Sequence, residues 1–252
     1  MKKIIVAEGI AKSFGEGAEK LQVLDGVSVE INEGEFVSVM GPSGSGKSTL
    51  LFALSGMDGV DGGRVTFDGQ DLTLLKENEL ADIRRTRMGF VFQRPTLLRN
   101  LNLLDNIILP AMRDNRKNVA KITERARALM TKAGIADLEK RDITQVSGGQ
   151  LQRADICRAL LGNPRIIFGD EPTGALNSKA AEEIMEIFSA ITADGTAVML
   201  VTHDARVAAR TERIMFMRDG KIVSETCLPR YDGTGMDDRT REVTAKLREI
   251  GI

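Results

Sequence analysis

The chain has 252 residues, 42% of them hydrophobic and 28% charged, which is the balance of an ordinary folded protein. Its 35 Lys and Arg residues almost match its 36 Asp and Glu residues, which excludes the charge excess typical of nucleic-acid binding or of a polybasic membrane anchor. No stretch approaches the ~18 uncharged apolar residues of a membrane helix, and the apolar run near Met1 stops at Glu8, too soon for a secretory signal. Cys157 and Cys227 form neither a disulfide framework nor a metal-binding motif. We therefore expect a cytosolic protein that does not bind nucleic acid.

In the first part of the chain, strand patterns alternate with glycine-rich turns. Alternating apolar residues predict a half-buried strand over 23–31, and an unbroken β-branched apolar run predicts a buried strand over 36–40. A helix is expected to begin at Ser48. Further strands are expected over 64–67 and 88–92.

The pattern changes after Gln93. Residues 97–163 have helical periodicity, which predicts a helical insertion. Strand patterns return over 165–168 and 197–201, and a helix is expected over 182–191 between them. Because strands and helices alternate, the chain is predicted to form a mainly parallel sheet with helices on its faces.

The end of the chain contains a hairpin and one more helix. Strands over 214–217 and 222–224 flank a turn. Behind them, Val243, Leu247 and Ile250 fall on one helical face, which predicts a helix that docks on the rest of the protein.

A phosphate-binding loop follows the strand over 36–40. The segment GPSGSGKST, residues 41–49, fits the pattern G-x-x-x-x-G-K-[ST] and lies between a predicted strand and a predicted helix. Backbone N–H groups of such a loop wrap a phosphate, and the helix N-terminus adds about half a positive charge. We expect Lys47 to reach the β- and γ-phosphates and the Ser48 hydroxyl to ligate Mg²⁺. The predicted nucleotide contacts are Gly41, Pro42, Ser43, Gly44, Ser45, Gly46, Lys47, Ser48 and Thr49.

Two adjacent carboxylates, Asp170 and Glu171, stand at the end of another predicted strand. In parallel sheets this edge is where ligands bind. Asp170 is expected to hold Mg²⁺ through water, and Glu171 to orient and partly deprotonate the attacking water. Alone, such a pair is often just two surface acids in a turn; beside a phosphate loop it indicates hydrolysis.

Two further polar residues follow strands in the same way. His203, the only histidine, comes after the strand over 197–201, where it could reach the γ-phosphate. A lone histidine is otherwise more often structural. Gln93 ends the strand over 88–92, and its amide could contact both Mg²⁺ and the attacking water. The predicted catalytic residues are Glu171, His203 and Gln93, and the predicted metal ligands are Ser48, Gln93 and Asp170.

A short polar segment, Ser147-Gly148-Gly149-Gln150, precedes an apolar helical pattern over 151–161. Alone, it could be an N-cap with a flexible loop, or another anion-binding helix start. Together with the phosphate loop, Gln93, Asp170-Glu171 and His203, in that order along the chain, it resembles the signature motif of the ABC ATPases. This resemblance covers almost the whole chain.

The resemblance implies an α/β fold of the P-loop NTPase (RecA-like) type, with a mainly parallel sheet core, an N-terminal antiparallel β subdomain and an α-helical insertion subdomain. The implied ranges are 1–93 and 164–225 for the nucleotide-binding core, 94–163 for the helical subdomain with the signature, and 226–252 for a C-terminal extension. Phe14 stands where the family often has a tyrosine that stacks on adenine; a buried core role is the alternative.

The resemblance also implies partners. Two copies would pack head to tail, with each ATP between the phosphate loop of one and Ser147, Gly148, Gly149 and Gln150 of the other. Gln93 and the helical insertion would couple to a separate integral membrane permease with a large extracellular domain. The chain would thus work at the cytoplasmic face of the membrane, with ATP and Mg²⁺ as cofactors.

Three segments narrow the resemblance: residues 40–43, 103–110 and 170–174 resemble the lipoprotein-release and macrolide-exporter group. Within it, the chain looks most similar to ATPases of bacitracin-type antimicrobial-peptide resistance transporters. The implied function is ATP hydrolysis that powers export or resistance to antibiotics through the permease, which would itself carry the substrate. The alternatives are a cell-division or other non-export ABC ATPase with a related permease, and a regulator that binds nucleotide without turnover. Glu171, Gln93 and His203 argue against the regulator.

One residue departs from the family pattern. Asn177 stands where the family usually has aspartate, in a loop that would lie at the dimer interface. The loss of a charge there bears on communication between the two ATP sites rather than on nucleotide binding.

Overall fold

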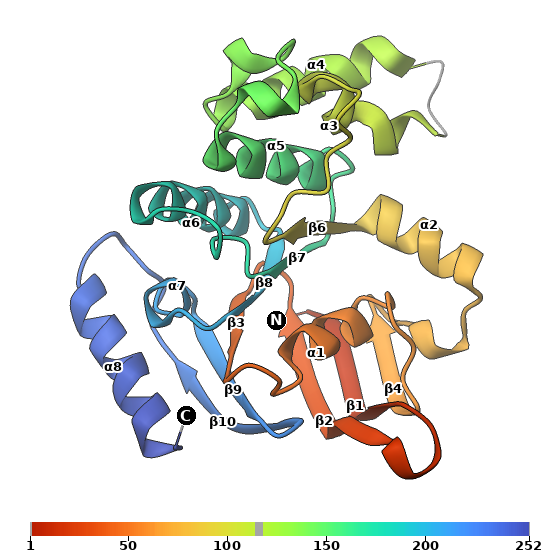
Figure 1. Ribbon diagram of the computed structural model, residues 1–252, viewed down its shortest axis with the longest axis vertical. Coiled ribbons are helices and arrows are strands. Elements are labelled where there is room, and N and C mark those ends of the chain that lie inside the picture. The colour runs from red at the N-terminus through yellow and green to blue at the C-terminus, as the bar shows by residue number, and fades with distance from the viewer. Residues whose placement is uncertain (1, 114–117, 252) are drawn as a thin grey trace.

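A six-stranded sheet forms the centre of the computed structural model, which describes residues 2–113 and 118–251 (Figure 1). In order across the sheet, its strands are β10 (Lys221–Cys227), β9 (Arg213–Arg218), β3 (Phe36–Met40), β8 (Ala197–Thr202), β7 (Ile166–Asp170) and β6 (Met88–Phe92). Neighbours from β9 to β6 are parallel, and only the edge pair β10–β9 is antiparallel. The predicted, mainly parallel core is therefore confirmed.

The central strands are apolar at almost every position because both faces of the sheet are covered. Every residue of β3 is buried, and its one polar side chain, Ser38, forms a hydrogen bond of 2.9 Å with Thr211. The strands predicted over 36–40 and 88–92 are confirmed. β7 continues beyond the predicted end at Phe168, because its pairing with β8 extends to Asp170.

A second, antiparallel sheet lies beside the first and confirms the N-terminal β subdomain. Its order is β2 (Leu21–Asn32), β1 (Lys3–Phe14), β4 (Gly62–Phe67) and β5 (Gln70–Asp71). The sequence pattern did not predict β1. Its pairing with β2 is interrupted by register shifts, which break the alternation of buried and exposed positions that marks a strand.

Helix α1 (Lys47–Leu54) joins the two sheets (Figure 1). It is apolar nearly all round: Leu50, Leu51 and Leu54 are fully buried and belong to one hydrophobic core that includes strands of both sheets. The N-terminus of α1 is therefore held firmly at the end of β3.

The opposite face of the central sheet is covered by α6 (Ser178–Ala193), whose Ile184 and Phe188 pack in a second core. The helix begins before the predicted range of 182–191. Asn177 explains the early start, because its side chain accepts a hydrogen bond of 2.9 Å from the backbone N–H of Ala180 and so caps the helix.

Three helices pack together, α3 (Leu103–Met112), α4 (Val119–Lys132) and α5 (Gly148–Leu160), and α5 also packs against β6 of the central sheet (Figure 1). They share their own hydrophobic core, as the helical periodicity predicted. The boundaries of this region at 94 and 163 stay a prediction, and the predicted domain ranges also include Met1, residues 114–117 and Ile252, which lie outside the described residues. Helix α2 (Glu77–Arg87) was not predicted, because it is polar and buries only Ile83.

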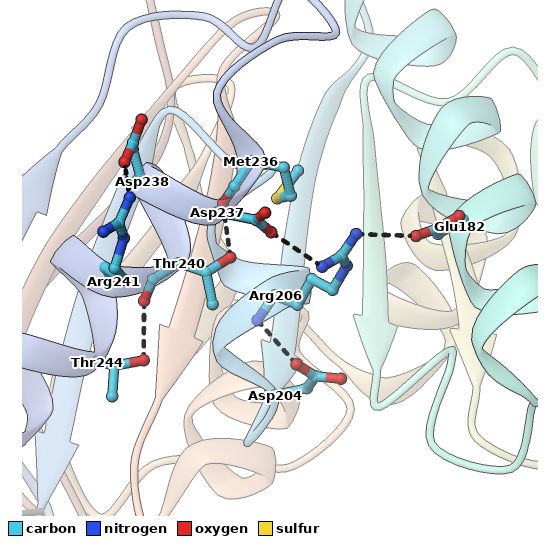
Figure 2. Close-up of polar contacts among 9 residues, drawn as sticks. All are labelled: Glu182, Asp204, Arg206, Met236, Asp237, Asp238, Thr240, Arg241 and Thr244. Atoms are coloured by element: carbon cyan, nitrogen blue, oxygen red, sulfur yellow. Dashed lines mark hydrogen bonds and ion pairs between the residues drawn. The ribbon is translucent and has the colours of Figure 1, made fainter.

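The C-terminal helix α8 (Met236–Glu249) packs against α7 (Ala205–Ala208) and buries Val243, with Leu247 and Ile250 beside it, as predicted. Figure 2 shows the polar side of this contact. The Arg206 guanidinium lies 3.1 Å from Glu182 of α6 and 3.5 Å from Asp237 of α8. Helix α7 is therefore held between α6 and α8.

None of the described helices is both long and apolar enough to cross a membrane.

Candidate functional site

The predicted site residues meet along one edge of the central sheet. Strands β3, β8, β7 and β6 are parallel neighbours, so their carboxyl ends lie side by side. The phosphate loop follows β3, His203 follows β8, Glu171 follows β7 and Gln93 follows β6. The fold thus collects side chains that are far apart in the sequence.

Two glycines of the phosphate loop are required by the structure. Gly46 has a φ of +98°, and a Cβ at that position would lie 2.7 Å from the carbonyl oxygen of Val23. A Cβ on Gly41 would lie 2.1 Å from the carbonyl oxygen of Met217. The loop therefore turns tightly between β3 and α1 and can present its backbone to a ligand.

Lys47 is buried, with 7% of its surface exposed, so it is not the solvated side chain expected of a free ligand group. Its ammonium donates hydrogen bonds of 2.9 Å to the carbonyl of Gly41 and 2.8 Å to that of Pro42. Burial lowers the pKa of Lys47, while Glu171 and Asp170 oppose that shift. The loop itself thus holds the cation in place.

Ser48 and Asp170 place two oxygen atoms side by side that can act as metal ligands. The Ser48 hydroxyl lies 2.9 Å from the Asp170 carboxylate. Burial raises the pKa of Asp170, as does Glu171, whereas the bond from Ser48 and the charge of Lys47 lower it. Mg²⁺ binds to proteins through one or two such oxygens together with phosphates and water, so this pair fits a magnesium ion.

Glu171 adopts a strained backbone, with a φ of +48°, at the end of β7. Its backbone N–H bonds the carbonyl of Val201, and its carboxylate lies 2.9 Å from Nδ1 of His203. A Cβ on Gly174 would lie 2.8 Å from the Gln93 amide nitrogen and 3.3 Å from the Glu171 carboxylate. The structure therefore brings all three predicted catalytic side chains together.

A cleft of about 820 Å³, here called the phosphate cleft, lies in front of these residues. It is lined by His203, Glu171 and all the predicted phosphate-loop residues except Ser45, which is buried. Phe14 also lines it and is 46% exposed, so the core alternative for Phe14 is wrong.

Sequence reasoning missed two residues of the phosphate cleft, Leu21 and Val23 of β2. Leu21 is 66% exposed although it is apolar. With Phe14 it forms an apolar wall suited to a flat ring. Only the pairing of β1 with β2, which joins Phe14 to Leu21, could have revealed this wall.

The signature segment lines a different hollow of about 320 Å³, here called the signature hollow, together with Asn177 and Arg153. Ser147 caps α5: its hydroxyl accepts from the backbone of Gln150, whose side chain accepts in turn from the backbone of Ser147. The signature hollow shares no lining residue with the phosphate cleft. Within one chain, Ser147, Gly148, Gly149 and Gln150 thus do not face the phosphate loop's cleft.

The fold and the phosphate cleft define a nucleotide-binding domain of the P-loop class. The sequence model of the ABC transporter family matches residues 24–174. The chain therefore belongs to the ABC transporter family and carries an ATP-binding ATPase domain of it.

Curated relatives agree with this assignment. The chain is 43% identical over 222 residues to the macrolide export ATP-binding/permease protein MacB of Chromobacterium violaceum, aligning 88% of this chain. It spans only 34% of the length of that relative. It is also 43% identical to the lipoprotein-releasing system ATP-binding protein LolD 2 of Rhodospirillum rubrum, with 88% of this chain and 96% of that protein covered.

A solved structure shows the same fold. It is the dimeric post-hydrolysis state of the ATP-binding cassette MJ0796 bound to ADP and Pi. It aligns with a TM-score of 0.81 and 37% identity, and covers 90% of this chain and 100% of the other. These comparisons support the lipoprotein-release and macrolide-exporter group indicated by the sequence.

Proposed function

We propose that this chain binds ATP with Mg²⁺ in the phosphate cleft, hydrolyses it in a head-to-tail pair of copies, and so drives a separate membrane permease. The observation that carries the proposal is that Lys47, Ser48, Glu171 and His203 line one cleft, with Asp170 bonded to Ser48 beside it. Two relatives are named for macrolide export and for lipoprotein release, and these names support a role in transport.

In this proposal the phosphate loop and Lys47 hold the phosphates by backbone N–H groups and by charge. The Ser48 hydroxyl and the Asp170 carboxylate hold Mg²⁺, which supplies neutralising charge at the phosphates when bound. Phe14 and Leu21 offer an apolar face to adenine.

Glu171 is the proposed general base. Its carboxylate accepts a proton from the attacking water as the bond to the γ-phosphorus forms and the bond to the β–γ bridging oxygen breaks. His203, 2.9 Å from Glu171, orients the carboxylate, and the nearby Gln93 amide positions the water. The strained backbone of Glu171 aims its side chain into the phosphate cleft.

The proposed second copy follows from the separation of the two hollows. In the part of the chain that the structure describes, the phosphate cleft and the signature hollow are separate and have no lining residue in common. A copy turned head to tail places its Ser147-Gly148-Gly149-Gln150 helix start, whose positive end favours an anion, over the nucleotide. The dimeric state of the MJ0796 structure supports this arrangement.

The proposed permease contact is a groove of about 380 Å³ between the core and the helical region. Phe90 and Phe92 of β6 stack along it at 6.4 Å, and Pro110 of α3 and Arg158 of α5 face them. An apolar floor with a cationic rim suits a short amphipathic segment of the permease. A permease with a large extracellular domain, an antimicrobial-peptide or antibiotic substrate, and a place at the cytoplasmic face of the membrane complete the proposal.

The test of this function is Glu171→Gln, which keeps size and hydrogen bonding but removes the base. We expect turnover to fall by ~10²–10⁴-fold, because that is the usual contribution of a general base. ATP binding is retained, since Lys47, Ser48 and Asp170 are unchanged. The variant with Mg-ATP elutes as a dimer on size exclusion, and with ADP as a monomer.

Each result speaks to one part of the proposal. Parent-level turnover in Glu171→Gln overturns the catalytic assignment. Binding of ATP without dimer formation at high protein concentration overturns the composite site. Purification of the chain from cells together with a membrane permease, followed by identification of that protein, tests the transport role.

A further inference from the structure

One face of helix α5 holds both ends of the segment that carries Gln93. The Gln152 amide donates a hydrogen bond of 2.9 Å to the carbonyl of Phe92, the residue before Gln93. Arg158 donates bonds of 2.8 Å and 3.0 Å to the carbonyl and hydroxyl oxygens of Thr96. Gln152 and Arg158 lie six residues apart on the helix that begins at the signature segment, so that helix holds the Gln93 segment on both sides of Gln93.

Asp155 lies between these two residues on the same face of α5, and none of its surface is exposed. Its carboxylate accepts a hydrogen bond and ion pair from Arg158. The Arg158 guanidinium is therefore bonded at once to a buried carboxylate and to Thr96. Because guanidinium is planar and donates in fixed directions, the carboxylate sets where Arg158 points.

Burial raises the pKa of Asp155 to about 6, although Arg158 and the backbone of Phe92 lower it. The contact between the Arg158 guanidinium and this carboxylate is that of an ion pair. Buried ion pairs add little net stability, because desolvation offsets the attraction. Ala154, Ile156 and Cys157 already bury this stretch of α5, so packing alone does not call for an acid at 155.

We propose that Asp155 is a positioning residue that locks Arg158 onto Thr96 and thereby makes the signature helix and the Gln93 segment move as one body. The inference rests on the proposed function, in which Gln93 positions water for hydrolysis and the signature segment closes over the nucleotide of the other copy. Arg158 also lines the groove assigned to the permease, so a segment seated there contacts the same lock.

In this proposal, the Asp155–Arg158 pair links a movement of α5 to the position of Gln93 through Thr96. A displacement of α5 shifts Arg158, Arg158 shifts Thr96, and the short chain from Thr96 back to Phe92 carries Gln93 with it. Without the buried carboxylate, Arg158 is free to turn toward water, and Gln93 is tied to α5 only at Phe92 through Gln152.

The test compares Asp155→Asn with the control Glu139→Gln in the purified chain. Asn keeps the volume of Asp but cannot form the ion pair. Glu139 also forms a carboxylate–arginine ion pair. Its carboxylate lies 2.7 Å from the Arg127 guanidinium, in the same helical region but away from Gln93. We expect kcat for ATP hydrolysis to fall about 5- to 50-fold in Asp155→Asn, since misplaced reacting groups cost up to ~10²-fold, while ATP affinity stays at the parent value. Glu139→Gln keeps both within about twofold.

A double-mutant cycle tests whether Asp155 acts through Arg158. If it does, Asp155→Asn combined with Arg158→Gln lowers kcat no further than Arg158→Gln alone. Hydrogen exchange of the backbone N–H groups from 92 to 97 rises in Asp155→Asn, and not in Glu139→Gln. Multiplied losses of kcat, or unchanged exchange in this segment, overturn the lock.

A third variant keeps the inference testable if Asp155→Asn does not fold. Thr96 is exposed, and Thr96→Val removes only the hydroxyl that Arg158 bonds. We expect a smaller loss of kcat, about two- to fivefold, with ATP affinity unchanged. Parent-level kcat in a folded Asp155→Asn overturns this inference alone, whereas a parent chain without ATPase activity overturns the proposed function itself.

Discussion

The phosphate cleft and the signature hollow are built in opposite ways. In the phosphate cleft, polar side chains from different elements bond one another: Ser48 of α1 bonds Asp170 of β7, and Glu171 bonds His203. The loop rests on α1, which is buried between two sheets. In the signature hollow, Ser147 and Gln150 bond each other within the first turn of a single helix.

From this difference we infer that the phosphate cleft is a preformed site and that the signature hollow is a movable one. The phosphate cleft draws its ligand groups from one rigid core, so one copy suffices to hold a nucleotide there. The signature segment begins α5, which shares a core with α3 and α4, while its Ile156 packs in the core of α6 and the central sheet. Its ties to the nucleotide-binding core include Gln152 to Phe92 and the ion pair of Arg153 with Glu183. Such a part can shift as a body while the phosphate cleft keeps its shape.

The substitution with the largest expected effect removes a binding group from the phosphate cleft. In Lys47→Ala we expect ATP binding by the single copy to be lost and turnover to fall by at least about 10²-fold, because a preplaced cation at the phosphates is removed. Nucleotide titration measures ATP binding, and a steady-state ATPase assay measures turnover. Since Lys47 is buried, Lys47→Met is the matched control that keeps the packing of its methylene chain. Activity near the parent's in Lys47→Met contradicts the role of the charge.

A substitution in the signature hollow is expected to act differently. Ser147 is exposed, so Ser147→Arg leaves the fold and nucleotide binding by the single copy intact, while its bulk prevents closure over the nucleotide of the other copy. The homodimer then turns over at background level. Ser147→Ala is the control, because it loses the same helix cap, at a cost of about 1 kcal/mol, without the bulk.

Mixing the two variants sharpens the comparison. A Ser147→Arg chain and a Lys47→Ala chain together can form one intact composite site, and return of some ATPase activity on mixing supports the head-to-tail pair. Normal hydrolysis by a Ser147→Arg homodimer contradicts it.

The sequence predicted the phosphate cleft better than its surroundings, for a physical reason. The phosphate loop, Asp170, His203 and Gln93 each stand at or next to a strand end, and a parallel sheet brings such ends together whatever the rest of the chain does. These predictions needed only local patterns and one rule of topology.

The remaining parts depend on contacts between distant segments. Leu21 reaches the phosphate cleft only because β2 pairs with β1. The register shifts of β1 remove the alternation of apolar and polar residues that would have predicted this strand. Asp155 looks like an exposed polar position in an amphipathic helix until β6 covers it, and nothing in the sequence shows that Arg158 will bond Thr96. The sequence thus predicted which side chains the fold brings together better than the contacts that hold them in place.

The smallest expected effect lies on the loop between the two regions, at Asn177. Asn177 lines the signature hollow and caps α6, with its side-chain oxygen 2.9 Å from the backbone nitrogen of Ala180. Aspartate caps helices equally well, and its charge is favourable at a helix N-terminus, so Asn177→Asp keeps or slightly raises the melting temperature. Turnover changes by less than about tenfold, well below the loss in Glu171→Gln, because the loop does not touch the phosphate cleft.

The control for this last substitution separates the cap from the charge. Asn177→Ala removes the cap, and we expect it to lower the stability of the protein by about 1 kcal/mol, whereas Asn177→Asp does not. If Asn177→Asp changes the dependence of turnover on ATP concentration while Asn177→Ala does not, the charge at 177 acts on communication between the two sites of the pair. Loss of nucleotide binding in Asn177→Asp contradicts the placement of this loop, because a residue that only lines the signature hollow cannot empty a cleft built from α1, β7 and β8.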